Sequence, residues 1–366
     1  MTAAIPLVDL AAQHAEVADE VADGWARVLA STAFVGGPPV AAFETAFAAH
    51  AGVEHCIGVA NGTDALELAL RALDVGPGDE CVLPANTFIA TAEAVARTGA
   101  TPVLADCDPD TALLDVAAVC AVLSDRTRAV VPVHLYGQTA DVTALRAALP
   151  PHVAICEDAA QAQGARHRGT CAGALGDLAA TSFYPGKNLG AYGDAGAVLT
   201  RSSTLAERVR LLGAHGSPRK YDHPVLGFNS RLDTLQAVVL GAKLAHLDRW
   251  NEQRRVAAAR YDALLADLPL TPPVVAPGNE PVWHLYVIQV ERRDEILAHL
   301  AAQGIGAGIH YPTPIHLTGA FGHLGKTGDH PHAERIAERI LSLPLHPHIT
   351  LEQQQRVTTA LDDALR

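Results

Sequence analysis

The chain has 366 residues, 49% of them hydrophobic, and a formal net charge of −13 from 27 Lys and Arg against 40 Asp and Glu. This length allows one large domain plus a smaller one, and the negative charge argues against nucleic acids or anionic membranes as partners, because both are anions. No stretch of ~18 uncharged apolar residues is present and the start lacks the pattern of a secretory signal, so we expect a cytoplasmic protein.

Short apolar runs alternate with Ala- and Leu-rich helical stretches in the first part of the chain, with helices expected at 63–73 and 143–150. Continuous apolar strands separated by helices are typical of a mainly parallel sheet that is covered on both faces. Ligands of such sheets bind at the carboxyl ends of the strands. The expected strands are 56–60, 80–84, 101–105, 129–134, 153–158, 180–185 and 196–200.

The pattern changes at about residue 233, where one long helix is expected to run to 268. A Pro-rich turn region, "PLTPPVVAPGNEP", follows it, and a smaller α+β segment begins with "WHLYVIQV". We therefore expect a large domain over 1–245 and a small C-terminal domain over 246–366.

Polar residues follow two of the expected strands directly. After "CIGVA", Gly62 permits a tight turn and Thr63 begins a helix whose free N–H groups suit a phosphate, although a plain helix cap would look the same. After "VAIC" stand Glu157 and Asp158. An Asp at this place would hold a protonated ring nitrogen by a charge-assisted hydrogen bond, or would simply cap the next turn.

A single lysine, Lys187, lies in the stretch "TSFYPGKNLGAYGDAG" at 181–196. A lysine amine with a lowered pKa condenses with a carbonyl group, whereas most lysines are only surface residues. The hydroxyl of Ser182 and the glycines at 186, 190, 193 and 196, which let backbone approach a ligand, favour the chemical interpretation. With Asp158 and the helix start at Gly62, these residues predict a site for pyridoxal 5′-phosphate (PLP), which needs a Lys, an Asp and a phosphate cradle.

The chain also resembles a known family, the nucleotide-sugar aminotransferases of the DegT/StrS group within the fold-type I PLP enzymes. The resemblance implies an α/β fold with a mainly parallel seven-stranded sheet in the large domain and a smaller C-terminal α+β domain. It runs over nearly the whole chain, in segments that keep the same order: "IPLVDL", "FVGGPPVAAFETAFA", "ANGTDALELAL", "PANTFIATAEAV", "EDAAQAQGA", "SFYPGKNLGAYGDAGAV", "GFNSRLDTLQA", "HYPTPIHL" and "LSLPLHP".

The family resemblance implies a role for each matching residue. Lys187 would bond to the cofactor aldehyde and carry the proton between substrate and cofactor carbons, and Asp158 would pair with the ring nitrogen. Asn229 would reach the phosphate of the other subunit, so an obligate homodimer with shared active sites is expected. By the same resemblance, Gly62, Thr63 and Ser182 would contact the phosphate of the cofactor. Phe88 would stack on its ring, and Gln161 would lie near the ring hydroxyl.

The resemblance implies L-glutamate as the amino donor and a keto sugar on a nucleotide diphosphate as the acceptor. The stretch "YPGKNLGAYGDAG" looks closest to members that aminate C-3 of a dTDP-linked 3-keto-6-deoxyhexose, and the C-4 enzymes are the alternative. A related branch with His in place of the lysine performs dehydration, so Lys187 favours transamination. The expected substrate-contacting residues are Tyr184, Tyr221, His310, Tyr311 and His316.

Two other classes of function compete with this interpretation. A catalytically silent regulator would keep the fold without needing Lys187, Asp158, Gln161 and Ser182 together. An NAD-linked oxidoreductase is disfavoured because "GIGAG" at 304–308 lacks the spacing and preceding strand of a dinucleotide fingerprint. Neither the scattered cysteines nor the two "HPH" stretches have the spacing of metal ligands, so no metal is expected.

Overall fold

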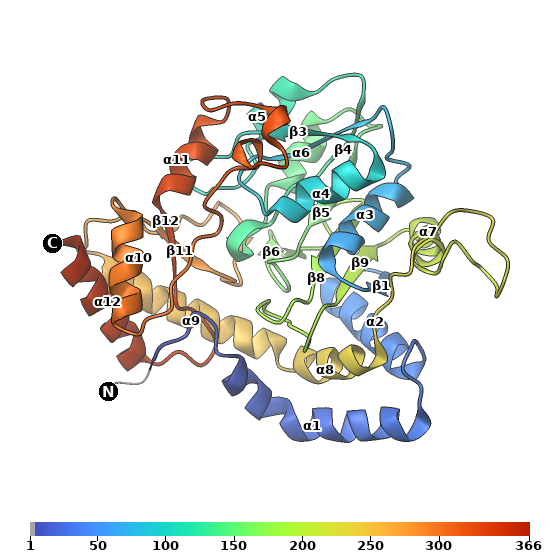
Figure 1. Ribbon diagram of the computed structural model, residues 1–366, viewed down its shortest axis with the longest axis horizontal. Coiled ribbons are helices and arrows are strands. Elements are labelled where there is room, and N and C mark those ends of the chain that lie inside the picture. Colours follow the sequence, from blue (N-terminus) through green and yellow to red (C-terminus); the bar gives the residue numbers. More distant parts are fainter. Residues whose placement is uncertain (1–3) are drawn as a thin grey trace.

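The computed structural model describes residues 4–366, and its centre is a seven-stranded sheet in the order β1-β9-β8-β5-β4-β2-β3 (Figure 1). Strand β9 runs antiparallel to both of its neighbours, and the other pairings are parallel. The prediction of a mainly parallel seven-stranded sheet is therefore confirmed. The strands are β1 (His55–Val59), β2 (Glu80–Pro84), β3 (Thr101–Ala105), β4 (Thr127–Val130), β5 (Ala154–Asp158), β8 (Leu178–Ser182) and β9 (Gly196–Thr200).

The strands are apolar along their length because helices cover both faces of the sheet. Alternate residues of one strand serve opposite layers: Leu83 of β2 packs with the core beneath α3 (Gly62–Ala72), α4 (Ile89–Thr98) and α7 (Ser203–Gly213), while Val82 belongs to the core on the other side. The helices of that second layer are α2 (Pro38–Ala51), α5 (Val116–Val122), α6 (Val142–Ala148) and α8 (Thr234–Leu244).

A second, smaller hydrophobic core lies in the C-terminal part, beside both chain ends in Figure 1. It is built on the two-stranded sheet of β11 (Tyr286–Gln289) and β12 (Ile340–Leu343), with α10 (Arg293–Ala302), α12 (Leu351–Leu365) and the end of α9 (Leu247–Leu265) packed on it. Ile5, near the start of the chain, also belongs to this core. The remaining elements are α1 (Leu10–Ser31), α11 (Pro331–Arg339), the three short helices 135–137, 315–317 and 322–324, and a small sheet of β6 (Arg166–His167), β7 (Thr170–Cys171) and β10 (Asn279–Glu280).

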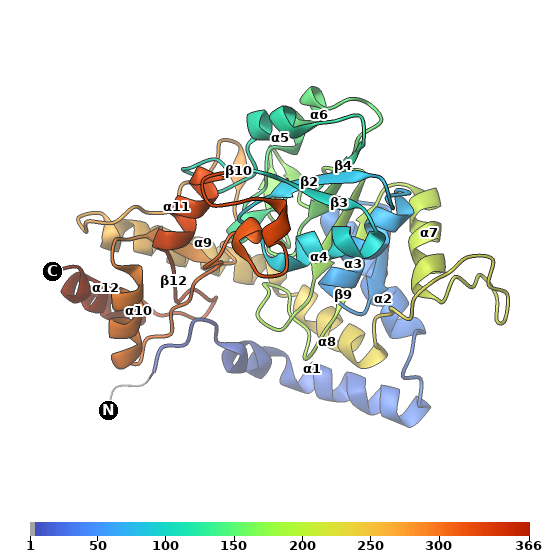
Figure 2. The same cartoon turned by 45° about the horizontal axis from the view of Figure 1, so that its top comes forward.

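The single long helix expected over 233–268 is wrong, because the chain forms two helices with a break at Ala245 and His246. Neither glycine nor proline causes the break. Helix α8 buries Val239 against α1, which runs along its outer side in Figure 2, and the start of α9 joins the same cluster through Trp250. Only the end of α9 carries Tyr261 into the small core. Tertiary packing therefore overrides a continuous helical pattern. The break coincides with the boundary predicted at 245/246, and the division into two domains there stays a prediction.

None of the helices in residues 4–366 combines the length and the apolar character needed to cross a membrane. The predicted cytoplasmic location is a separate matter, which this observation does not test.

Candidate active site

A cavity of about 480 Å³ opens at the carboxyl ends of the parallel strands. Asp158 ends β5 and Ser182 ends β8 at its wall, and Phe88 follows β2. The C-terminal part closes it, and Leu7 and Val8 from the start of the chain form a further side. Ten of the thirteen predicted site residues line this cavity: Gly62, Thr63, Phe88, Asp158, Gln161, Ser182, Tyr184, Lys187, His310 and Tyr311.

The amino-terminal end of α3 forms one end of the cavity. Asn61 caps this helix, its side-chain oxygen accepting a hydrogen bond from Asp64 N at 2.8 Å. Within the described chain, the N–H groups of Gly62 and Thr63 have no acceptor. The hydroxyl oxygen of Ser182 accepts a hydrogen bond from Tyr184 N at 3.2 Å, so its proton remains free to donate. Free N–H groups at a helix start, with a hydroxyl beside them, make a cradle for an anion.

Asp158 lies 6% exposed at the floor of the cavity. Its Oδ2 accepts from Thr91 Oγ1 at 2.8 Å and its Oδ1 accepts from Ala160 N at 3.2 Å. Burial raises the pKa of this carboxyl, while the two hydrogen bonds and the nearby Lys187 pull it back down. A buried carboxylate of this kind is stabilised further by a cationic partner in the cavity, such as a protonated ring nitrogen.

Lys187 stands in the loop after β8, which is fixed by the hydrogen bond from Lys187 N to Tyr184 O at 2.8 Å. Its side-chain amine has no hydrogen bond or ion pair within residues 4–366. Burial lowers the pKa of the amine to about 8, and the charge of Asp158 offsets part of that shift. A larger fraction of the amine is therefore neutral near pH 7 than in an exposed lysine, which is the state that attacks a carbonyl.

Gln161 and two tyrosines form a fixed group beside the carboxylate. Gln161 Oε1 accepts from Tyr136 N at 2.6 Å, and its Nε2 donates to the Tyr311 hydroxyl at 3.0 Å. The Phe88 ring is half exposed, and its centre lies 5.1 Å from the centre of the Tyr311 ring. Both aromatic faces are thus held at the cavity wall, where a flat ligand ring has a surface to pack on.

Three predicted residues lie outside this cavity. Asn229 is exposed, and the adjacent Ser230 ties its segment to α3 through a hydrogen bond to Asp64 Oδ2 at 2.8 Å. Tyr221 is 84% exposed on the loop after α7. His316 is buried and bonded to Glu334 Oε1 at 2.9 Å, so within one chain it stabilises the fold near the short helix 315–317 instead of lining the substrate entrance.

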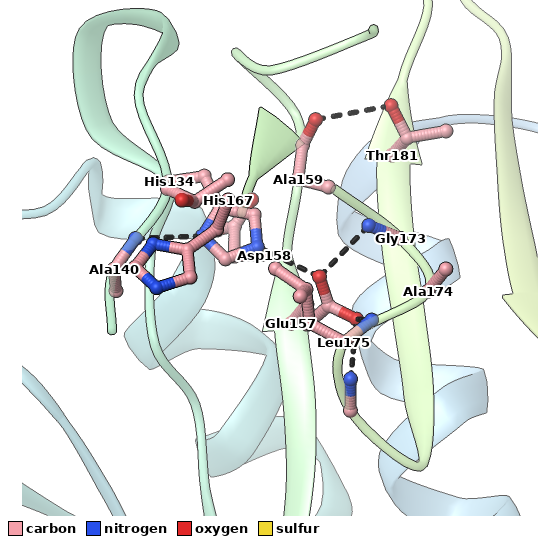
Figure 3. Close-up of polar contacts among 12 residues, drawn as sticks. His134, Ala140, Glu157, Asp158, Ala159, His167, Gly173, Ala174, Leu175 and Thr181 are labelled. Carbon is pink, nitrogen blue, oxygen red and sulfur yellow. Dashed lines mark hydrogen bonds and ion pairs between the residues drawn. The ribbon is translucent and has the colours of Figure 1, made fainter. Parts of the chain in front are cut away.

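Sequence reasoning gave no role to a buried network behind Asp158 (Figure 3). Glu157, whose side chain lies on the other face of β5, accepts hydrogen bonds at 2.7–2.8 Å from His134 Nε2 and from the N–H groups of Gly173, Leu175 and Gly176. All four partners are donors, so both oxygens of Glu157 serve as acceptors. The "ED" pair was visible in the sequence, but nothing in the sequence indicated that His134, 23 residues earlier, would face Glu157.

The residues present fit PLP. They supply an unpartnered amine, a buried carboxylate, an anion cradle and aromatic faces around one cavity, and these are the groups that its aldehyde, ring nitrogen, phosphate and ring require. A fold-type I sheet with these groups at its strand ends defines a PLP-dependent enzyme.

Comparison with known proteins identifies the family. Residues 16–362 match the DegT/DnrJ/EryC1/StrS aminotransferase family, and the chain belongs to it. Aminotransferases of this family depend on PLP, and a solved relative contains bound pyridoxamine phosphate. The resemblance stated from the sequence is thus confirmed.

Individual relatives match the chain over nearly its full length. It is 49% identical over 363 residues to a dTDP-3-amino-3,4,6-trideoxy-α-D-glucose transaminase from Streptomyces venezuelae, covering 98% of this chain and 96% of that protein. It is 46% identical to a pleiotropic regulatory protein from Geobacillus stearothermophilus, covering 99% of each. The crystal structure of S. venezuelae DesV, 49% identical, superposes with a TM-score of 0.97 over 100% of both chains.

Proposed function

We propose that this aminotransferase moves an amino group from L-glutamate to C-3 of a dTDP-linked 3-keto-6-deoxyhexose, in the biosynthesis of a deoxyaminosugar. The observation that carries the proposal is the free amine of Lys187 in the same cavity as the buried Asp158 carboxylate. The similarity to the transaminase from S. venezuelae supports the choice of sugar carbon and nucleotide.

The residues would divide the work as follows. When bound, PLP supplies an electron sink for the carbanion that forms at the substrate carbon. Asp158 keeps the ring nitrogen protonated, and Gly62, Thr63 and Ser182 hold the phosphate. Lys187, with its amine unpaired and its pKa lowered to about 8, takes the proton from the substrate carbon and returns it.

The remaining predicted contacts surround these groups. Phe88 would pack on the ring face, and Gln161 would approach the ring hydroxyl. Tyr184, 61% exposed, and His310 and Tyr311 at the opposite wall would contact the sugar nucleotide.

We propose further that the enzyme is a homodimer with shared active sites. Asn229 is exposed and lies outside its own cavity, as expected for a side chain that reaches the phosphate bound by the partner subunit. Tyr221 extends on the preceding loop and would approach the same neighbouring site.

The test is an assay of the purified protein with PLP, L-glutamate and a panel of 3-keto and 4-keto nucleotide sugars. NMR of the product locates the new amine, and we expect it on C-3. Lys187→Ala should abolish turnover. An amine on C-4 would replace the C-3 assignment, and no turnover with any sugar would favour a regulator, a role suggested by the name of the relative from G. stearothermophilus.

A further inference from the structure

One cavity residue has a ring orientation that its neighbours determine, although the mechanism above does not use it. His284 is 8% exposed and lies in the segment before β11, 97 residues after Lys187. It lines the same cavity as Lys187. Its Nδ1 pairs with the side chain of Asn188, the residue that follows Lys187, at 3.3 Å.

The hydrogen bonds of Asn188 identify the donor in this contact. Its amide Nδ2 donates to Val282 O and to Asn251 Oδ1, both at 2.9 Å. A backbone carbonyl only accepts, so the atom of Asn188 that faces Val282 must be the nitrogen, and the atom that faces His284 must be the oxygen. Asn251 is oriented in the same way, because its Nδ2 donates to Gln163 O at 2.9 Å. The Nδ1 of His284 is therefore the protonated nitrogen.

The other nitrogen of the ring, Nε2, is left as a lone-pair acceptor. Within residues 4–366, Nε2 has no hydrogen-bond partner. It is also not completely buried, so part of its surface remains accessible. The cavity that His284 lines provides that surface.

A second proton on His284 is strongly disfavoured. Burial and the positive charges of Lys187 and Arg254, together with His310, move the pKa of the ring well below its usual range. Arg254 is itself buried, and it donates to the carbonyl of Trp283, the residue before His284, and to Leu345 O. The imidazole thus stays neutral, with its acceptor in the cavity.

The backbone of His284 is held as firmly as its ring. Gly137, at φ +104°, lies so close that a Cβ there would stand 2.5 Å from His284 N. Val282 N donates to Gly137 O at 2.8 Å, and Leu285 N donates to Tyr136 O at 3.2 Å. The acceptor is therefore fixed in position as well as in tautomer.

We propose that His284 is a positioning residue for Lys187: Asn188 holds it as the Nδ1–H tautomer, and its Nε2 accepts a hydrogen bond from the Lys187 amine when the free lysine side chain turns toward the ring. In the structure the two nitrogens share the cavity without a hydrogen bond, so the contact requires the flexible lysine side chain to turn toward the ring. The proposal rests on the proposed function only in assigning the reacting amine to Lys187.

An acceptor beside the amine favours its protonated form. His284→Asn keeps a donor at the Nδ1 position toward Asn188 but removes the acceptor, whereas His284→Gln keeps an acceptor near the Nε2 position. We expect the Asn variant to lower the pKa of Lys187 by about one unit, a tenfold change in its protonation equilibrium, and the Gln variant to restore most of it.

The titration is measured by competitive acetylation with acetic anhydride across pH, with mass spectrometry of the Lys187 peptide and the exposed Lys220 as internal reference. The full-length protein is used in its cofactor-free form and loaded with pyridoxamine phosphate. An unchanged Lys187 titration in His284→Asn overturns the proposal. If that variant raises only the KM for L-glutamate, the acceptor serves the substrate and the proposal is equally wrong.

A second measurement uses the wild-type protein, so it does not depend on whether a variant folds. Histidine-labelled wild-type protein is examined by ¹⁵N NMR, which distinguishes the protonated ring nitrogen from the unprotonated one. We expect a neutral Nδ1–H ring at His284 from about pH 6 to pH 9. An Nε2–H ring or an imidazolium overturns the proposal. Because these readouts involve no sugar, they are independent of whether the proposed substrate is correct.

Discussion

Gly62 at the start of α3 lies directly against Ser182 at the end of β8: a Cβ on Gly62 would stand 2.5 Å from the Cβ of Ser182. Only glycine allows this approach, which brings the free N–H groups of the helix and the hydroxyl of Ser182 to one place. Gly196 on β9 supports the same arrangement, because a Cβ there would lie 2.4 Å from Asn61 O. The proposed phosphate cradle therefore depends on two positions without side chains.

Gly62→Ala should weaken PLP binding, because the added methyl group pushes α3 away from Ser182. We expect the dissociation constant to rise by about tenfold or more, or at least ~1.4 kcal/mol, in a fluorescence titration of the cofactor-free protein. Gly76→Ala is the matched control, since a Cβ there meets nothing within 4 Å. PLP binding as tight as in the wild type would show that the helix start does not hold the phosphate.

Asp158→Asn keeps the shape of the side chain but removes the charge that holds the ring nitrogen protonated. We expect kcat to fall by roughly 10²–10⁴, the range for losing a group that handles a proton. The cofactor content, read from the visible spectrum, should change less than the rate. Asp125→Asn, an exposed residue in the turn before β4, is the control. A wild-type rate in Asp158→Asn would remove the proposed role of this carboxylate.

Glu157→Gln should destabilise the fold. In the wild type, His134 and three backbone N–H groups all donate to this carboxylate, and the amide nitrogen of Gln would place its own N–H groups against some of these donors. Leaving a buried donor without its acceptor typically costs about 1–3 kcal/mol. Urea unfolding, followed by circular dichroism, measures the change. The exposed Glu93→Gln should stay within about 0.5 kcal/mol of the wild type. Equal stability of the two variants would mean that the contacts with His134 and the 173–176 turn contribute little.

Lys243 makes the stability depend on alkaline pH. The residue is 2% exposed, and its amine donates to Gly190 O at 2.7 Å and lies 4.5 Å from the centre of the Tyr192 ring. Burial lowers its pKa from 10.5 to about 8 in the folded protein. Between these two values the unfolded chain binds more protons, so this residue's contribution to stability increases as pH rises from 8 to 10.5, and its cost is complete below 8.

Lys243→Met removes this dependence. We expect the free energy of unfolding of the wild type, relative to the variant, to rise by about 1–3 kcal/mol between pH 7.5 and pH 10. Urea titrations of both proteins at several pH values provide the comparison, in which the Lys187 contribution is shared and cancels. A difference that is constant with pH would contradict the lowered pKa.

The shared active site can be tested with mixed dimers of Lys187→Ala and Asn229→Ala chains, co-expressed with different tags. If Asn229 serves the partner's site, one site of the mixed dimer carries both lesions and the other carries neither. About half of the wild-type activity should then return, as two-fold symmetry requires. If Asn229 acts in its own chain, each site keeps one lesion and no recovery follows. The test requires Asn229→Ala alone to lose activity through weaker PLP retention, and a variant that retains PLP normally would remove the basis for the proposal.

The sequence alone indicated the sheet and most of the cavity, because these depend on local patterns. Apolar runs broken by helices predict a parallel sheet, and such a sheet brings its strand ends to one edge. Residues directly after strands, such as Gly62, Asp158 and Ser182, therefore met where expected. The family resemblance added Phe88 and Gln161, which lie at the same edge.

What the sequence did not determine depends on contacts between distant segments. The break between α8 and α9 has no local signal, since the helical pattern runs through it; beyond the break the end of α9 reaches the small core, whereas α8 packs against α1. His316 was expected at the substrate entrance, but its hydrogen bond with Glu334, 18 residues later, holds it inside the fold. Likewise His284 has no local signal, because its tautomer is set by Asn188 and its position by Gly137. Local propensity and spacing determine the elements and the ends at which ligands bind, whereas the tertiary packing of polar groups decides which histidine faces the cavity and which nitrogen it presents.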